Sequence, residues 1–272
     1  MKMNIDLIKY TGIGQFGPAY QIMLENDAHA QGSVDRVLVA RMIRICLETA
    51  EYLYTAYTPI EVKYQKGSRP ELERYVNDAV TGCKSDEDRI RNIASFCSRL
   101  SIKVENQPLD DIIFGGTEEE IIQRGSDFCT DIARVGCTLC QVAGIPARIV
   151  FLADTAQAYS GHVLIEAYRN EFWGTVDTST NVIYQHPDGK SATTWDLMNN
   201  PRLIEAHQRS NAIYTNAGQF RSIAISNYFI WKKYDYTVST LNDYYLSILE
   251  MSDKGWIGGL RWLHGENKAT NI

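Results

Sequence analysis

Three residues in the middle of the chain have the side-chain chemistry of a cysteine nucleophile and its two partners. Cys129 lies where a helix is expected to begin, His162 on an expected strand, and Asp177 on the strand that follows. In such a site the thiolate attacks a carbonyl carbon, the imidazole takes up the thiol proton, and the carboxylate orients the ring. The three residue types therefore predict nucleophilic acyl transfer at a Cys-His-Asp site.

The helix that is expected to carry Cys129 has a regular apolar pattern. One face holds apolar residues at spacings of four and three: Phe128, Ile132, Val135, Leu139 and Val142. Gly144 is the expected left-handed residue after the helix, and Pro146 prevents its continuation. Cys129 therefore falls in the first helical turn, where unpaired N–H groups and the helix dipole favour a thiolate.

A hairpin is expected to bring His162 and Asp177 together. If Arg169 and Asn170 form a two-residue turn, His162 lies opposite Asp177, with Cβ atoms about 4.5–5.5 Å apart. A loop one residue longer or shorter would still leave the two residues adjacent. The opposite face of the hairpin is then apolar and holds Val163, Ile165, Ala167, Phe172 and Val176.

An acyl-transfer site also needs donors for the oxyanion of the tetrahedral intermediate. The backbone N–H of Cys129 is one expected donor, alongside one side chain. Gln123 is the candidate for that side chain because it lies just upstream of the nucleophile. The alternative for Gln123 is an exposed glutamine at the end of a helix.

Capping patterns and apolar spacing predict the flanking elements. Ser85 with Asp88 resembles a capping box, and Thr117 with Glu120 has the spacing of another. One long helix is expected from Ser33 to Tyr57. Further helices are expected over residues 71–80, from about 86 to 100, and over 118–122, 195–198 and 201–208, with a strand over 147–153.

Composition narrows the class of protein. A net charge of −6 argues against a nucleic-acid partner, which would favour a basic surface. No apolar run is long enough to cross a membrane, and the first residues lack the apolar core of a signal peptide. Six cysteines in 272 residues are too dilute for a disulfide scaffold, so we expect a reduced, cytoplasmic protein.

Two short motifs could indicate other chemistry. Residues Gly12 to Gly17 match GxGxxG, but Pro18 follows and no βαβ unit is evident, so a glycine-rich loop is favoured over dinucleotide binding. Cys137 and Cys140 form a single CxxC inside the expected helix, which favours packing over a metal or redox site. Arg148 either binds a substrate carboxylate or, as we favour, forms a structural ion pair.

A set of motif residues runs in order along this part of the chain: Gly125, Cys129–Ala133, Gly144–Arg148, His162 with Glu166, Trp173 and Asp177–Thr178. In this order and spacing they resemble the core of the transglutaminase-like superfamily. Thr130 stands where animal transglutaminases have tryptophan, and Trp173 is the first tryptophan of the chain. The resemblance therefore does not extend to their indole oxyanion donor or to protein crosslinking.

The resemblance implies an α+β, papain-like fold with a catalytic helix on an antiparallel sheet, and a Cys129-His162-Asp177 triad that acts through a thioester. It implies a peptide, amide or acyl-thioester substrate. No acidic cluster resembles a calcium site and no paired CxxC set resembles a zinc site, so we expect no cofactor or metal. The acyl group would pass to water, as in a peptidase or amidase, or to an amine. The alternatives are an acyltransferase for carrier-bound acyl groups and a non-catalytic binding scaffold.

We expect a single domain over residues 1–272. A mainly helical part over 1–115 would precede the catalytic core at 116–200, and an aromatic-rich part would follow at 201–272. The aromatic residues of this last part could line a substrate cleft or form core.

Overall fold

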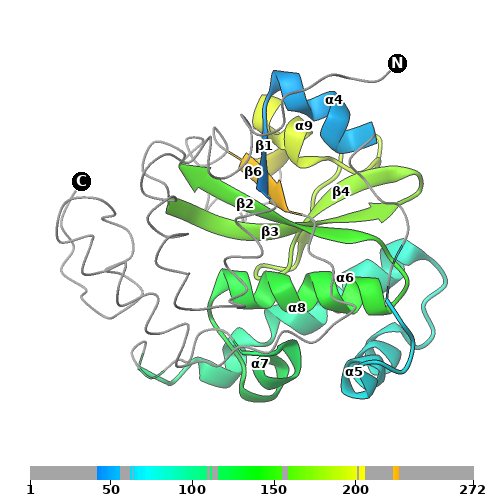
Figure 1. The fold of residues 1–272 in the computed structure, drawn as a ribbon, viewed down its shortest axis with the longest axis vertical. Helices are drawn as coiled ribbons and strands as arrows, with labels where there is room; N and C mark the ends of the chain where they lie inside the picture. The colour runs from blue at the N-terminus through cyan, green and yellow to red at the C-terminus, as the bar shows by residue number, and fades with distance from the viewer. Residues whose placement is uncertain are drawn as a thin grey trace.

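An antiparallel sheet is the centre of the fold, with strands in the order β1-β6-β2-β3-β4-β5 (Figure 1). The computed structural model describes residues 42–55, 62, 64–108, 111, 116–154, 159–200, 202–205 and 223–226. The strands are β1 (Met42–Ile45), β2 (Ala147–Asp154), β3 (Tyr159–Arg169), β4 (Phe172–Asp177), β5 (Val182–Ile183) and β6 (Ile223–Ser226). The motif Gly12–Gly17 and most of the aromatic-rich part lie outside the described residues.

Helices cover both faces of the sheet. On one face, α8 (Cys129–Val142) and α6 (Asp86–Ser98) pack against the sheet, and α5 (Pro70–Val80) and α7 (Glu118–Arg124) pack against α8. A 3₁₀ turn at Ser101–Val104 follows α6. The other face holds α4 (Leu47–Thr55), α9 (Thr194–Asn199) and α10 (Arg202–Glu205). The architecture is therefore α+β, as the sequence predicts. None of the described helices has both the length and the apolar character needed to cross a membrane.

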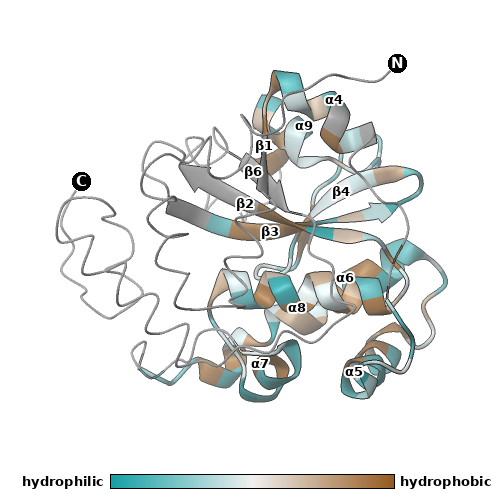
Figure 2. Cartoon of the chain, in the orientation of Figure 1, coloured by the Kyte–Doolittle hydropathy of each residue, from teal (hydrophilic) through white to brown (hydrophobic). Residues whose placement is uncertain are grey.

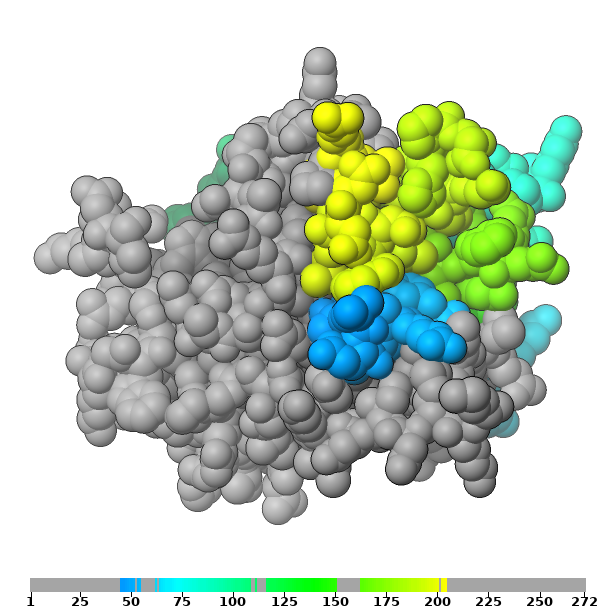
Figure 3. Space-filling model, turned by 90° about the horizontal axis from the view of Figure 1, so that it is seen from above, coloured from blue at the N-terminus to red at the C-terminus, as the bar shows by residue number. Residues whose placement is uncertain are grey.

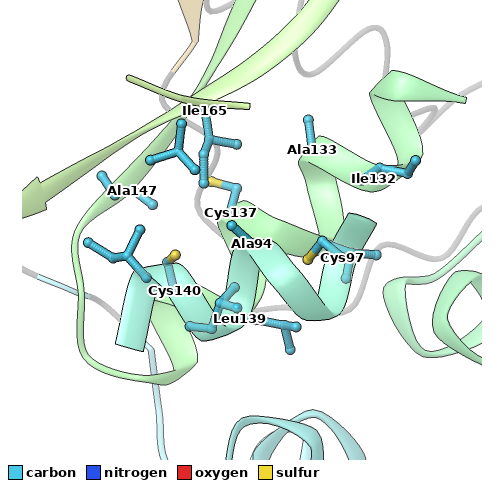
Figure 4. Packing of buried hydrophobic residues seen from close by; sticks show 14 of the residues in the cluster. Ala94, Cys97, Ile132, Ala133, Cys137, Leu139, Cys140, Ala147 and Ile165 are labelled. Atoms are coloured by element: carbon cyan, nitrogen blue, oxygen red, sulfur yellow. The ribbon is translucent and has the colours of Figure 1, made fainter. Parts of the chain in front are cut away.

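The main core lies between the sheet and α8. Figure 4 shows Cys137 and Cys140 of α8 packed with Cys97 of α6 and with Ala147 and Ile165 of the sheet. Burial raises the pKa of all three thiols, in Cys140 to about 12, so they are held as neutral SH groups. The CxxC pair is thus part of the core packing. Figure 2 shows brown, apolar residues in β3, α6 and α8, the elements around this core.

The capping patterns are confirmed. The Ser85 hydroxyl accepts a hydrogen bond from the Asp88 N–H at 3.1 Å. Thr117 and Glu120 form a complete capping box, and so do Thr193 and Asp196. Gly144 has φ +82°, as expected for the residue that ends a helix in the left-handed conformation.

The long helix expected from Ser33 to Tyr57 is confirmed only over Leu47–Thr55 and is wrong over Met42–Ile45. Met42–Ile45 forms strand β1 and pairs with β6, and the helix begins only at Leu47. Thr49 helps to cap the start of this helix, because its hydroxyl accepts a hydrogen bond from the Cys46 N–H at 3.0 Å. Apolar residues at 42 and 45 fit a helical face as well as a strand, and the pairing that decides for the strand comes from residues 223–226.

The β3–β4 hairpin has a different turn from the expected one. Asn170 and Glu171 are the turn residues, with φ values of 50° and 68°. These values fit a two-residue turn of type I′, which requires positive φ at both positions. Arg169 therefore pairs with Phe172, and Ile165 with Val176. Phe172 was expected on the apolar face but is 55% exposed at the end of the hairpin.

A buried ion pair between two strands connects the sheet to α4, on the face that also holds α9 and α10. Arg148 of β2 donates from Nε to Glu166 of β3 at 2.8 Å, and both side chains are fully buried. Its guanidinium lies 4.2 Å from the ring centre of Trp173 and donates to the Leu53 carbonyl of α4. This confirms the structural ion pair expected for Arg148.

Two helices close over this ion pair. The Tyr54 hydroxyl of α4 donates to Glu166 at 2.8 Å and accepts from the Trp195 N–H of α9 at 3.1 Å. Burial and the Glu166 charge raise the pKa of Tyr54 well above its usual value. Figure 3 shows the residues of α4, in blue, directly beside those of α9, in yellow.

Candidate active site

Cys129 is the first residue of α8 and is partly exposed. Phe128, in extended conformation, precedes it as the N-cap. A residue at this position has no acceptor for its N–H within the helix, so the backbone amide and the thiol of Cys129 lie together at the positive end of the helix dipole. The predicted start of the helix at Cys129 is confirmed.

His162 lies on β3 next to an irregularity in the pairing with β2. Leu152 pairs with His162 and Ala153 with Ser160, so Gly161 is an extra residue in β3. Such a bulge bends and twists the strand and re-aims the neighbouring side chain. His162 is 6% exposed, and the Nε2 of its ring lies 3.3 Å from Oδ2 of Asp177.

Asp177, the last residue of β4, is fixed through its other oxygen. Its Oδ1 accepts hydrogen bonds from the N–H groups of Ser179 at 2.9 Å and Thr180 at 3.2 Å. The carboxyl is fully buried, which opposes ionisation, but the hydrogen bond and charge of His162 with the Thr180 N–H lower its pKa. Asp177 is therefore an oriented carboxylate facing the imidazole.

The His162–Asp177 contact is diagonal. Because Ile165 pairs with Val176, continuation of the ladder would set Asp177 opposite Leu164, two residues from His162. Diagonal neighbours have separations of about 7–8 Å, which an imidazole and a carboxylate can bridge. The expected contact is thus present, but in another register from the one proposed.

The third group, Cys129, also acts on His162. Burial alone would lower the pKa of this imidazole. The negative charge of a Cys129 thiolate, with hydrogen bonds to Asp177 and Cys129, outweighs burial and raises it to about 10. The structure therefore brings all three predicted residues together, with the His162 ring next to both the Asp177 carboxylate and the Cys129 sulfur.

Close packing holds α8 against the turn after Asp177. A Cβ atom on Gly136 of α8 would lie 2.6 Å from Cγ2 of Thr178, which is too close for any larger residue without a shift. The helix that carries the thiol thus rests directly on the residue next to the carboxylate. Gly136 makes this approach possible.

A family model for the transglutaminase-like superfamily matches residues 73–178. This stretch contains a transglutaminase-like domain. It runs from α5 to the end of β4 and includes Cys129, His162 and Asp177. No curated protein and no solved structure matches the chain significantly. The match begins well before Gly125, where the resemblance of motif residues starts, so α5 and α6 belong to the matched stretch as well.

Members of this superfamily generally have cysteine-dependent acyl-transfer or hydrolase activity. Gln123, the candidate oxyanion donor, is exposed near the end of α7, and its backbone carbonyl accepts a hydrogen bond from Lys103 at 3.3 Å. A catalytic role for its side chain stays a prediction. Among the described residues of the transglutaminase-like domain and its surroundings, no group of three or more His, Cys, Asp or Glu could hold a metal ion.

Several buried polar residues at the start of α8 were not predicted from the sequence. Ser126, Asp131 and Arg134 are buried around the start of α8 and contact one another or their neighbours. A signal was present, because Asp131 and Arg134 are charged residues three apart in a helix that is otherwise largely apolar. Charged residues buried in this way must be paired, which indicates a built arrangement at this end of the helix.

Proposed function

We propose that this protein is a cysteine-dependent acyl-transfer enzyme, with Cys129 as nucleophile, His162 as general acid and base, and Asp177 as the residue that orients the ring. The transglutaminase-like domain supports the class of chemistry. The observation that carries the assignment is the position of the buried His162 ring. Its Nε2 lies 3.3 Å from Asp177, and the charge of Cys129 raises the pKa of the ring. We also propose a papain-like core at residues 116–200 with α8 as its catalytic helix, a mainly helical part before it and an aromatic-rich part after it.

The reaction follows from the positions of the polar groups. His162 has Nε2 on Asp177, so Nδ1 is the nitrogen that exchanges a proton with the thiol. The Cys129 thiolate attacks the carbonyl carbon of an amide or thioester, and the carbonyl oxygen becomes an oxyanion near the Cys129 N–H. Collapse of the intermediate breaks the bond to the amine or thiol leaving group, which takes the proton from His162 and leaves a thioester on Cys129.

The second half of the reaction restores the enzyme. His162, now neutral, removes a proton from the acceptor, which attacks the thioester carbonyl and releases Cys129. We place water ahead of an amine as the acceptor, so the proposed substrates are peptides, amides or acyl thioesters that undergo hydrolysis. Asp177 stabilises the protonated ring in both halves without taking the proton itself.

The test is capture of the acyl-enzyme. The purified protein is incubated with a panel of activated acyl esters, thioesters and electrophilic amide analogues, and the intact mass is measured. We expect a single acyl adduct on the wild type and none on Cys129→Ala, while Cys83→Ala, a partly exposed cysteine outside the site, keeps the adduct. Equal adducts on wild type and Cys129→Ala would contradict the proposed nucleophile.

A further inference from the structure

The start of α8 lacks the usual side-chain cap. Its N-cap residue is Phe128, and a phenyl ring offers no acceptor for the first amides of the helix. A Ser, Thr, Asp or Asn at this position normally does so and stabilises the helix end. The helix that carries the proposed nucleophile must therefore be fixed at this end by other groups.

Ser126 and Asp131 supply that support through a chain of two hydrogen bonds. The Phe128 N–H donates to Oγ of Ser126 at 3.1 Å, and the Ser126 hydroxyl donates to Oδ2 of Asp131 at 3.0 Å. Asp131 is the third residue of α8, where a capping box has the carboxylate that binds the N-cap N–H directly. Here a buried serine hydroxyl stands between the two, and both side chains are fully buried.

This arrangement has consequences for the nucleophile two residues before Asp131. The serine hydroxyl fixes the extended backbone at Phe128, and hence the point at which Cys129 enters the helix. The N–H of Phe128 donates to Ser126, whose hydroxyl donates in turn to Asp131. The next N–H along the chain, that of Cys129, is the proposed oxyanion donor. A rigid start of the helix also fixes the distance between the thiol and His162.

The carboxylate of Asp131 would repel a thiolate if its charge were not balanced. Arg124 lies 3.2 Å from its Oδ2, and Arg134 lies 3.6 Å from its Oδ1. Arg134 is itself bound to Glu118 at 3.0 Å, and Glu118 to Arg69 at 2.6 Å. These pairs connect α8 to α7 and to the start of α5. Asp131 therefore belongs to a network of ion pairs that involves three helices.

We propose that Ser126 and Asp131 are positioning residues that hold the Cys129 thiol against His162 by fixing the backbone at Phe128. This inference rests on the proposed role of Cys129. We therefore expect the loss of the Ser126 hydroxyl to affect the reactivity of the Cys129 thiol more than the stability of the fold, because this hydroxyl fixes Phe128, the residue before Cys129.

The test compares Ser126→Ala with Thr138→Ala. Thr138 lies further along α8, is fully buried and donates one hydrogen bond to the Arg134 carbonyl at 2.7 Å, so its loss costs a comparable buried interaction away from Cys129. The rate of Cys129 alkylation by iodoacetamide at pH 6 is measured by peptide mass spectrometry, with Cys83 of the same molecules as the reference. The melting temperature of each variant is recorded.

We expect Ser126→Ala to slow alkylation of Cys129 about tenfold relative to Cys83, and Thr138→Ala to leave it within about twofold at a similar loss of melting temperature. A wild-type rate in folded Ser126→Ala overturns the inference. If that variant does not fold, Asp131→Ala breaks the same chain at its other end, and a wild-type rate there has the same meaning. If Cys129 of the wild type reacts no faster than Cys83, the proposed function itself fails.

Discussion

His162→Gln slows the alkylation of Cys129 at pH 6 on the order of 10-fold to 10²-fold. An ordinary cysteine is almost entirely a neutral thiol at this pH, whereas a thiol paired with a charged imidazole reacts as the thiolate. His162 is buried between Cys129 and Asp177. Its replacement by an uncharged amide of similar size removes the positive charge beside the Cys129 thiol, while the negative charge of Asp177 remains nearby. The rate is measured with iodoacetamide and peptide mass spectrometry.

Two partly exposed cysteines serve as controls in the same molecules. Cys46 and Cys83 lie outside the site and keep their rates in His162→Gln. The rate of acyl-adduct formation is expected to fall by an additional factor of about 10² to 10⁴, because general acid–base catalysis is lost as well. Unchanged alkylation of Cys129 in the folded variant would show that the ring does not activate the thiol.

Glu166→Gln is expected to lower the free energy of unfolding by about 3–5 kcal/mol, a large part of the stability of a typical domain. The substitution removes the carboxylate that lies 2.6 Å from the Arg148 guanidinium, and Arg148 is 0% exposed. It also removes the charge from the carboxylate whose Oε1 accepts hydrogen bonds from the Tyr54 hydroxyl and the Thr194 N–H, both at 2.8 Å. Urea unfolding followed by circular dichroism measures the effect.

An exposed ion pair provides the matched control. Arg89 and Asp86 of α6 lie 3.2 Å apart with side chains 41% and 49% exposed. Arg89→Gln removes one charge of this pair and is expected to change the unfolding free energy by less than about 0.5 kcal/mol. A similar small effect from Glu166→Gln would mean that the buried pair contributes little to joining α4 and α9 to the sheet.

Local signals made much of the fold predictable. The helix caps at Ser85 and Thr117, the start of α8 at Cys129 and its end at Gly144 each depend on residues within a few positions of one another. Strand β1 could not be found in this way, because its partner β6 lies about 180 residues further along the chain. Met42 and Ile45 suit either a helix or a strand until that partner is known.

The site was predicted for a reason that was only partly right. His162 and Asp177 do meet across a hairpin, but the turn lies at Asn170 and Glu171 and the contact is diagonal. The bulge at Gly161 that re-aims His162 could not be read from alternation of apolar residues, because it depends on the pairing with β2. The support by Ser126 and Asp131 was missed because a cap that acts through an inserted hydroxyl has no established sequence pattern.

The protonation state of His162 tests the central claim most directly. We expect ¹⁵N-detected imidazole resonances of the wild type to show this ring still charged at pH 8, with a midpoint near the pKa of about 10. Because the thiolate charge is the largest attraction that raises this pKa, Cys129→Ser should move the midpoint to lower pH. A wild-type ring that loses its proton near pH 6.5, with no change in Cys129→Ser, would show that Cys129 and His162 do not form the ion pair on which the proposed function depends.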